Sequence, residues 1–187
     1  MGKLFFTSDL HFGHDREFIW GPRGYKSCKE ADEATIKNWN SVVTDDDTVY
    51  VVGDFFLGND EDYVREVLEK LNGRIYLALG NHDSEKKQAI YRTFKKIIEM
   101  DTSFQITYNG RRFHICHYPT LTASLESDPK HCLFDIFGHT HSNAKFFKDR
   151  PYMYNVSVYA QNNMPVSIDQ INEDIDNEIK KCISYLV

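Results

Sequence analysis

The stretch RIYLALGNHD, from Arg74 to Asp83, joins an apolar run of strand length directly to a block of polar residues. Its first part is rich in Ile, Tyr and Leu and is typical of a buried β-strand. The block Gly80-Asn81-His82-Asp83 that follows is typical of a loop carrying chemical groups. A strand that ends in such a block predicts an α/β fold with a site at the carboxyl edge of its sheet.

The same kind of junction occurs at four other places in the chain. Other apolar runs end at Asp9-Leu10-His11, Gly53-Asp54, His117 and Gly138-His139-Thr140-His141. Because the carboxyl ends of strands gather at one edge of a sheet, we expect these polar residues to meet. A glycine directly precedes the polar residue at three of the five junctions, where it lets the backbone approach an ion or ligand closely.

Runs of strand length alternate with amphipathic stretches of helical period, which predicts one layered α/β domain over residues 1–187. The expected strands are Lys3–Thr7, Thr48–Val52, Arg74–Leu79, Phe104–Tyr108, Arg112–Cys116, Leu133–Phe137 and Tyr152–Val158. The expected helices are Glu30–Val43, Asp60–Leu71 and Ile168–Tyr185, each with an apolar stripe for the core.

Composition excludes several functional classes. With 187 residues, 41% of them hydrophobic, the chain is long enough for a folded core. The net charge of −6 disfavours a protein that grips long nucleic acids. Neither a signal peptide nor an apolar run of membrane-spanning length is present, so we expect a cytoplasmic protein with no membrane partner. The oligomeric state is left open.

Several other features have simple structural interpretations. The scattered cysteines, Cys28, Cys116, Cys132 and Cys182, indicate reduced and mostly buried thiols. We expect the acidic run Asp45–Asp47 to be a solvated turn, and His114 and His131 to be ordinary core or surface histidines. The basic pairs Lys86-Lys87, Lys95-Lys96 and Arg111-Arg112 are interpreted as solvated helix or turn faces.

The residues at the strand ends have the chemistry of metal ligands. Carboxylates, one amide and several imidazoles, without a thiolate, suit Mn²⁺, Fe, Co²⁺, Ni²⁺ or Zn²⁺ in a site that keeps water. A closed structural zinc site would use cysteine instead. The order D-x-H, G-D, G-N-H-D, H and G-H-x-H makes a chance arrangement hard to accept.

These motifs resemble those of the calcineurin-like metallophosphoesterase superfamily, in particular its small single-domain bacterial and phage members that begin with DLHFGH. The resemblance extends from Leu4 to about Asp169. It implies a four-layer αββα sandwich, in which two mixed β-sheets are flanked by helices. It also implies a hydrolase of phosphomonoester or phosphodiester bonds in small substrates, for which nucleotides are natural candidates.

The resemblance also implies a role for each ligand-type residue. Two divalent metal ions are expected, manganese first and iron, zinc, nickel or cobalt as alternatives. Asp9, His11 and His141 would hold one ion, Asn81, His117 and His139 the other, and Asp54 would bridge them. A bridging hydroxide would be the nucleophile. His82, next to a ligand but outside the ligand set, would be the general acid.

The chain departs from the superfamily in two places. Ser/Thr phosphatases and dinucleoside tetraphosphatases continue the second block as G-D-x-x-D-R-G, whereas this chain reads Gly53-Asp54-Phe55-Phe56-Leu57-Gly58. Without that Arg, those two activities become improbable and another group must hold the phosphate. Small relatives tend to show N-V-G-V-D where this chain has Asn155-Val156-Ser157-Val158-Tyr159.

Substrate contacts are expected near the first metal block. We predict that His14, Arg23 and Asn81 contact the substrate. In the loop Asp15–Lys29, Trp20 or Tyr25 could stack on a base, but the same aromatic residues could equally pack on the first helix. His14 could likewise serve only to turn the chain.

Two alternative functions remain open at this point. A nuclease acting on nucleic acid ends would use the same metal chemistry, but the acidic charge disfavours it. A non-catalytic scaffold of the same fold, such as the retromer subunit, would have an eroded metal site. Every ligand position is filled in this chain, which favours an enzyme.

Overall fold

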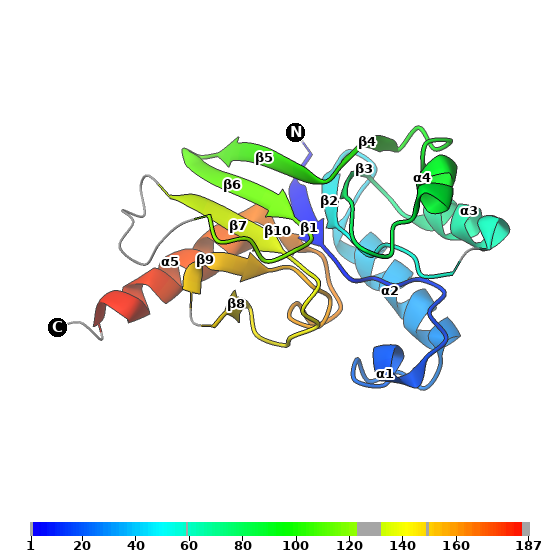
Figure 1. The fold of residues 1–187 in the computed structure, drawn as a ribbon, viewed down its shortest axis with the longest axis horizontal. Helices are drawn as coiled ribbons and strands as arrows, with labels where there is room; N and C mark the ends of the chain where they lie inside the picture. Colours follow the sequence, from blue (N-terminus) through cyan, green and yellow to red (C-terminus); the bar gives the residue numbers. More distant parts are fainter. Residues whose placement is uncertain (1, 59, 123–131, 149, 185–187) are drawn as a thin grey trace.

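The computed structural model describes residues 2–58, 60–122, 132–148 and 150–184. It contains two mixed β-sheets flanked by helices, which confirms the predicted fold class (Figure 1). No helix in these ranges is both long enough and apolar enough to cross a membrane.

The first sheet has the strand order β10-β1-β2-β3-β4. Its strands are β1 (Leu4–Thr7), β2 (Thr48–Val52), β3 (Arg74–Ala78), β4 (Ile97–Asp101) and β10 (Val166–Ser167). Strands β1 to β4 are parallel, and β10 pairs antiparallel with β1. Because Val52 lies opposite Ala78 in the register, the loops after β2 and β3 leave the sheet side by side.

The second sheet has the strand order β5-β6-β7-β9-β8. Its strands are β5 (Ser103–Tyr108), β6 (Arg111–Cys116), β7 (Leu133–Phe137), β8 (Phe146–Phe147) and β9 (Arg150–Asn155). Strands β6, β7 and β9 are parallel, whereas β5 and β8 run antiparallel to their neighbours. The carboxyl ends of β6 and β7 therefore point the same way.

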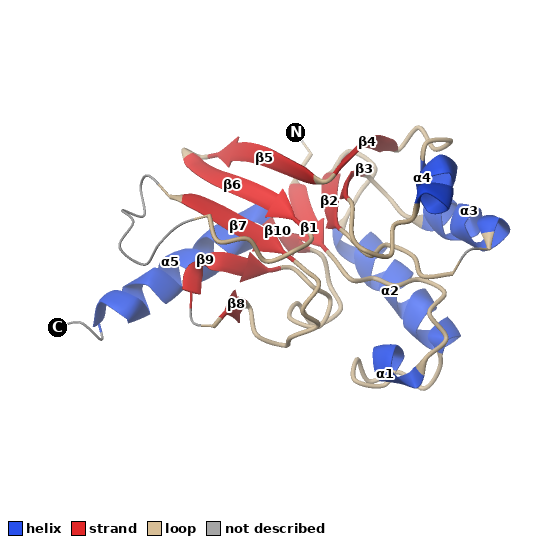
Figure 2. Cartoon of the chain, in the orientation of Figure 1, coloured by secondary structure: helices blue, strands red, loops and turns tan. Residues whose placement is uncertain are grey.

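Two apolar cores hold these layers together. In the first core, the first sheet packs against α2 (Cys28–Val42), α3 (Glu61–Lys70) and α4 (Glu85–Tyr91), which Figure 2 shows grouped on one side. The second core joins the two sheets, and α5 (Ile168–Ser184) contributes Ile168, Ile171 and Ile175 to it. A short helix, α1 (Glu17–Trp20), lies apart from α5 beside α2.

Local sequence explains where the longer helices begin. The Ser27 hydroxyl accepts a hydrogen bond from the Glu30 amide at the start of α2. Asp60 likewise accepts from the Asp62 and Tyr63 amides at the start of α3. All three predicted helices are present, with ends within two residues of those predicted for α2 and α3. The predicted end of the last helix, Tyr185, lies outside the described residues.

The seven predicted strands are present, but the last is shorter than predicted. Strand β9 ends at Asn155, whereas the prediction continued to Val158. The Asn155 side chain donates to the carbonyls of Ser142 and Ala144, and the chain after it leaves the sheet. Strands β4, β8 and β10 and helices α1 and α4 were not predicted from the sequence.

Candidate metal centre

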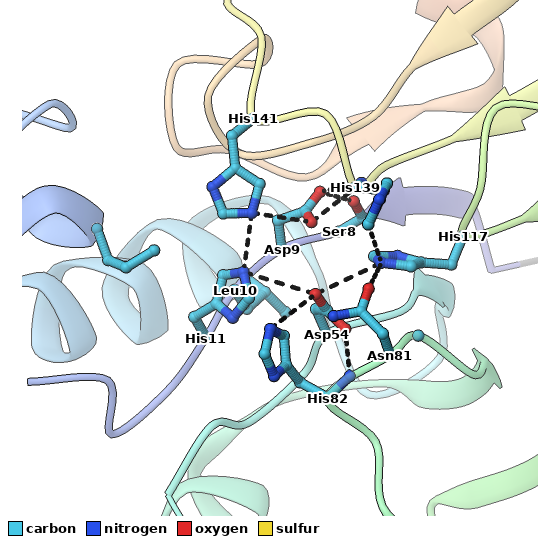
Figure 3. A network of polar contacts seen from close by, with 12 residues as sticks. Ser8, Asp9, Leu10, His11, Asp54, Asn81, His82, His117, His139 and His141 are labelled. Carbon is cyan, nitrogen blue, oxygen red and sulfur yellow. Dashed lines mark hydrogen bonds and ion pairs between the residues drawn. The ribbon is translucent and has the colours of Figure 1, made fainter. Parts of the chain in front are cut away.

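The predicted ligand residues come together at the carboxyl ends of five strands from both sheets. Figure 3 shows their side chains turned toward one another. Asp9, Asp54 and Asn81 follow β1, β2 and β3, and His117 and His139 follow β6 and β7. His141 completes the set two residues later.

One end of this cluster is formed by Asp9, His11 and His141, whose ligand atoms all lie within 4.8 Å of one another. The Nε2 atoms of His11 and His141 are 3.1 Å apart. His141 Nε2 lies 3.5 Å from Asp9 Oδ1. This is the group that the sequence assigns to one metal ion.

The other end is formed around His117. Its Nε2 atom lies 3.1 Å from Asn81 Oδ1 and 3.2 Å from His139 Nδ1. Asp54 Oδ2 lies 3.4 Å from the same nitrogen and 3.8 Å from His11 Nε2. The Asp54 carboxylate therefore lies between the two groups, where a bridging ligand would be needed.

The donor atoms fit divalent cations. His117 Nδ1 donates to the Val52 carbonyl at 2.9 Å, so its Nε2 is directed toward Asp54 and Asn81. Pairs of ring nitrogens at 3.1 and 3.2 Å need a shared proton or a cation between them. Imidazole, carboxylate and amide donors without a thiolate match the metals that the sequence predicts.

Protonation within the cluster follows from burial and from the neighbouring charges. Burial lowers the pKa of His11, which keeps the ring neutral and its lone pair available. Although burial raises the pKa of Asp54, its hydrogen bond and ion pair with His117 lower it below the usual value. Burial lowers the pKa of His117, but the contacts with Asp54 and Asp9 outweigh burial, so that the pKa lies above its usual value. A metal ion that binds at His117 Nε2 would therefore compete with a proton for that atom.

The three glycines that precede ligand residues are needed for close approach. A Cβ atom on Gly53 would lie 2.3 Å from His117 Nδ1, and one on Gly80 would lie 2.3 Å from Asp54 Oδ1. A Cβ atom on Gly138 would lie 1.9 Å from Ser8 Oγ. Any larger residue at these positions would push a ligand side chain out of place.

Five of the seven ligand residues have a left-handed backbone, with φ between 49° and 67°. They are Asp9, His11, Asp54, His139 and His141. Non-glycine residues rarely adopt this conformation, which costs about 1–2 kcal/mol each. Here it turns each side chain back toward the centre in the loops after the strands; Asp9, His11 and Asp54 are buried, whereas His139 and His141 are at the solvent side.

His82 lies beside the ligands but is not one of them. Its backbone amide donates to Asp54 Oδ1 at 2.9 Å, whereas its Nε2 atom is 4.0 Å from Asp54 Oδ2. The side chain is 42% exposed, and its ring lies 5.4 Å from the His11 ring. The imidazole can therefore reach a substrate that enters the centre from solvent.

Of the predicted substrate contacts, His14 lies beside the ligands, whereas Arg23 is bound to other parts of the protein. The His14 ring is 5.8 Å from the His11 ring, and its buried Nδ1 atom has no hydrogen-bond partner among the residues that the structure describes. Arg23, in contrast, donates to Asn163 Oδ1 and Thr35 Oγ1, both at 2.7 Å. These bonds give Arg23 a role in holding its loop to α2, and they do not support a phosphate contact.

Sequence reasoning missed two buried residues that support the centre. Asp83 accepts hydrogen bonds from the amides of Asp54, Phe55 and Gly80, so it ties the loop after β2 to the loop after β3. Lys87 donates to the carbonyls of Phe56 and His82, both at 2.7 Å. The interpretation of Lys86-Lys87 as a solvated pair is wrong for Lys87, which is 3% exposed.

The segment after β9 supports the ligand His141 in a way that the sequence did not indicate. The Tyr159 ring stacks on the His141 ring at 4.8 Å, and its hydroxyl donates to the Ile19 carbonyl. Tyr159 is the residue where small relatives tend to have Asp. The departure from the family motif therefore links the metal centre to α1.

The remaining structural interpretations can be checked directly. His114 Nδ1 lies 3.0 Å from Asp135 Oδ1, as expected of an ordinary paired histidine, and His131 lies outside the described residues. Asp45 and Asp46 are exposed, but Asp47 is buried and caps a turn. All four cysteines are free thiols, although three are only partly buried.

Two comparisons with known protein sequences find relatives that match almost the whole chain. The model of the calcineurin-like phosphoesterase family matches residues 2–170. An uncharacterised protein of Methanocaldococcus jannaschii is 35% identical over 176 residues, which cover 91% of this chain and 90% of that protein.

Solved structures show the same fold. A protein of unknown function from Aquifex aeolicus superposes with a TM-score of 0.69 at 25% identity, covering 92% of this chain and 99% of that one. An archaeal phosphodiesterase superposes with a TM-score of 0.50 at 19% identity, covering 83% of this chain and 82% of that one. The second likeness concerns the fold alone.

Proposed function

Because this chain belongs to the calcineurin-like phosphoesterase family, we propose that it hydrolyses phosphomonoester or phosphodiester bonds in small, nucleotide-like substrates. The observation that carries the proposal is the position of Asp54 Oδ2, which lies 3.4 Å from His117 Nε2 and 3.8 Å from His11 Nε2. One carboxylate between two groups of donor atoms suits a two-metal site.

Seven side chains would hold the two ions. Asp9, His11 and His141 would bind one, Asn81, His117 and His139 the other, and Asp54 both. When bound, the ions would polarise the phosphate and lower the pKa of a water molecule so that it supplies the nucleophile. Manganese is the proposed metal, with iron, zinc, nickel and cobalt as alternatives.

His82 is proposed as the general acid. The new bond joins the water oxygen to phosphorus, and the bond from phosphorus to the leaving oxygen breaks. The proton from the His82 imidazole goes to that leaving oxygen, so that an alcohol departs. The hydrogen bond from the His82 amide to Asp54 and the bond from Lys87 to the His82 carbonyl hold the loop that presents this imidazole.

The phosphate needs a contact that replaces the missing Arg. His14 is proposed for this role because its ring lies 5.8 Å from the ring of the ligand His11. Asn81, whose amide group is at the exposed side of the centre, is proposed to contact the substrate as well as a metal ion. Both side chains could reach a phosphate held between the two groups of ligands.

The proposal is tested by metal-dependent turnover. Protein stripped with a chelator and reconstituted with Mn²⁺ is assayed on p-nitrophenyl phosphate and bis(p-nitrophenyl) phosphate, with an Asp54→Ala variant as control for contaminating enzymes. We expect turnover of at least one ester that requires metal and is lost in the variant. Absence of turnover on both esters with each of the five metals would overturn the proposal.

A further inference from the structure

Two exposed aromatic side chains border the metal centre. Among the described residues, the exposed large hydrophobic side chains are Phe18, Ile98, Tyr118 and Leu121. Tyr118 contacts the ligand histidines His117 and His139, whereas Phe18 contacts His14, the neighbour of the ligand His11. An exposed apolar side chain is common on protein surfaces, but two aromatic rings beside one polar site suggest a binding surface.

Phe18 lies at the His11 end of the centre. Its ring is 68% exposed and lies 5.5 Å from the His14 ring, which in turn lies 5.8 Å from the His11 ring. Helix α1 is anchored through its other side, where Ile19 is buried and its carbonyl accepts from Tyr159. Because Ile19 supplies the packing, the fold does not require an aromatic ring at position 18.

Tyr118 lies at the opposite end of the centre. Its ring is 4.8 Å from the His139 ring and 5.2 Å from the His117 ring, both in edge-to-face geometry. The side chain is 47% exposed, so a face of the ring remains available to solvent. Phe18 and Tyr118 therefore flank the ligand set, one beyond His11 and the other beyond His117 and His139.

From this arrangement we infer that the substrate is a phosphodiester whose two alcohol groups each carry a flat ring, as in a dinucleotide. The inference rests on the proposed function. The phosphate would lie between the two groups of metal ligands, with one base on Phe18 and the other on Tyr118. Every base has a π-face, so such contacts favour nucleotides without selecting a sequence.

Hydrolysis of this substrate needs no reactant other than water. Water adds its oxygen to phosphorus, and one of the two ester bonds breaks. One nucleoside keeps the phosphate as a monoester, and the other leaves as an alcohol. A monoester substrate would use only one of the two rings, so the pair of rings favours the diester.

The test compares two diesters with the same leaving group. Thymidine 5′-(p-nitrophenyl phosphate) has a ring on each side of phosphorus, whereas methyl p-nitrophenyl phosphate has a ring on one side only. We expect kcat/KM of the wild type to be larger for the thymidine ester by roughly 5-fold or more. The leucine variant of the residue that holds the thymine, Phe18→Leu or Tyr118→Leu, should reduce this ratio, and the other leucine variant should lower kcat/KM for both esters alike. Ile98→Ala, a change at an exposed apolar residue on β4, should leave both values of kcat/KM unchanged.

A binding measurement separates this inference from the proposed function. A dithymidine phosphonate, in which a methylene group replaces one bridging oxygen, is titrated calorimetrically into wild-type and variant protein at equal metal content. A rise in Kd in both leucine variants, but not in Ile98→Ala, supports the inference even if neither diester is turned over. A Kd that is unchanged in either leucine variant, or a kcat/KM ratio that is unchanged in both of them, overturns it.

Discussion

The His82 side chain lies next to the metal ligands without belonging to the ligand set, which is the position that a general acid needs. We expect His82→Asn to reduce kcat about 100-fold or more on an alkyl phosphate ester, since general acids typically contribute that much. The loss should be much smaller with p-nitrophenolate, a leaving group that needs no proton. Steady-state kinetics on both esters, with metal content verified, make the comparison; equal losses would rule out acid catalysis.

For single residues, the sequence motifs predicted the ligand-type residues, but they did not predict the buried residues that support them. The ligand-type residues could be predicted because each stands directly after an apolar run, and the structure brings them together. Asp83 and Lys87 could not, because their hydrogen bonds reach loops about 30 positions away. Lys87 also lies in α4, a helix of seven residues whose inward face the sequence did not indicate.

Among the elements, the turn from β2 into the Asp54 loop has a strict steric requirement that involves a ligand side chain directly. We expect Gly53→Ala to lower metal content and turnover by roughly 10-fold or more, because its Cβ would displace His117 from the centre. Gly110→Ala is the matched control, since Gly110 has a similar φ of 80° but a Cβ atom added there would meet no atom within 4 Å. Elemental analysis and kinetics measure both variants, and equal behaviour would contradict the steric argument.

The turn between α2 and β2 gives a prediction about pH. Asp47 accepts hydrogen bonds from the amides of Lys3 and Thr44. Burial raises the pKa of Asp47, but these hydrogen bonds outweigh it and lower the pKa below the unfolded value. The stabilisation is therefore present above about pH 4 and is lost as the pH falls through the lower, folded pKa.

Asp47→Asn should accordingly reduce the free energy of unfolding at pH 7 by about 1–3 kcal/mol, and the difference should shrink below about pH 4. Asp46→Asn, at the exposed neighbouring position, should have little effect at either pH. Urea unfolding at pH 7 and pH 3 measures both variants. A difference that persists undiminished at pH 3 would show that the carboxylate charge is not the cause.

The elements that the sequence missed are the short and edge ones. Strands β8 and β10 have two residues each, too few for a recognisable pattern, and exist because they pair with β9 and β1. Strand β4 lies at the edge of the first sheet and is largely exposed, so it lacks an apolar run. Long-range pairing, which local sequence does not encode, determines all three.

In the whole molecule, the ligand set joins the two sheets, since β1 to β3 belong to one and β6 and β7 to the other. Metal bound to the folded state alone should therefore stabilise the entire protein. At a metal concentration about 1000 times Kd the gain is about 4 kcal/mol, which raises Tm by roughly 10 °C. Thermal unfolding with Mn²⁺ and with chelator measures this difference, and an identical Tm in Asp54→Ala and the wild type with Mn²⁺ would contradict it.

We propose that this arrangement of side chains holds two metal ions with Asp54 between them. Anomalous diffraction at the manganese edge from Mn²⁺-loaded crystals tests it most directly. We expect two peaks, one among Asp9, His11 and His141 and the other among Asn81, His117 and His139, with Asp54 in contact with both. A single peak, or no peak among these residues, would contradict it.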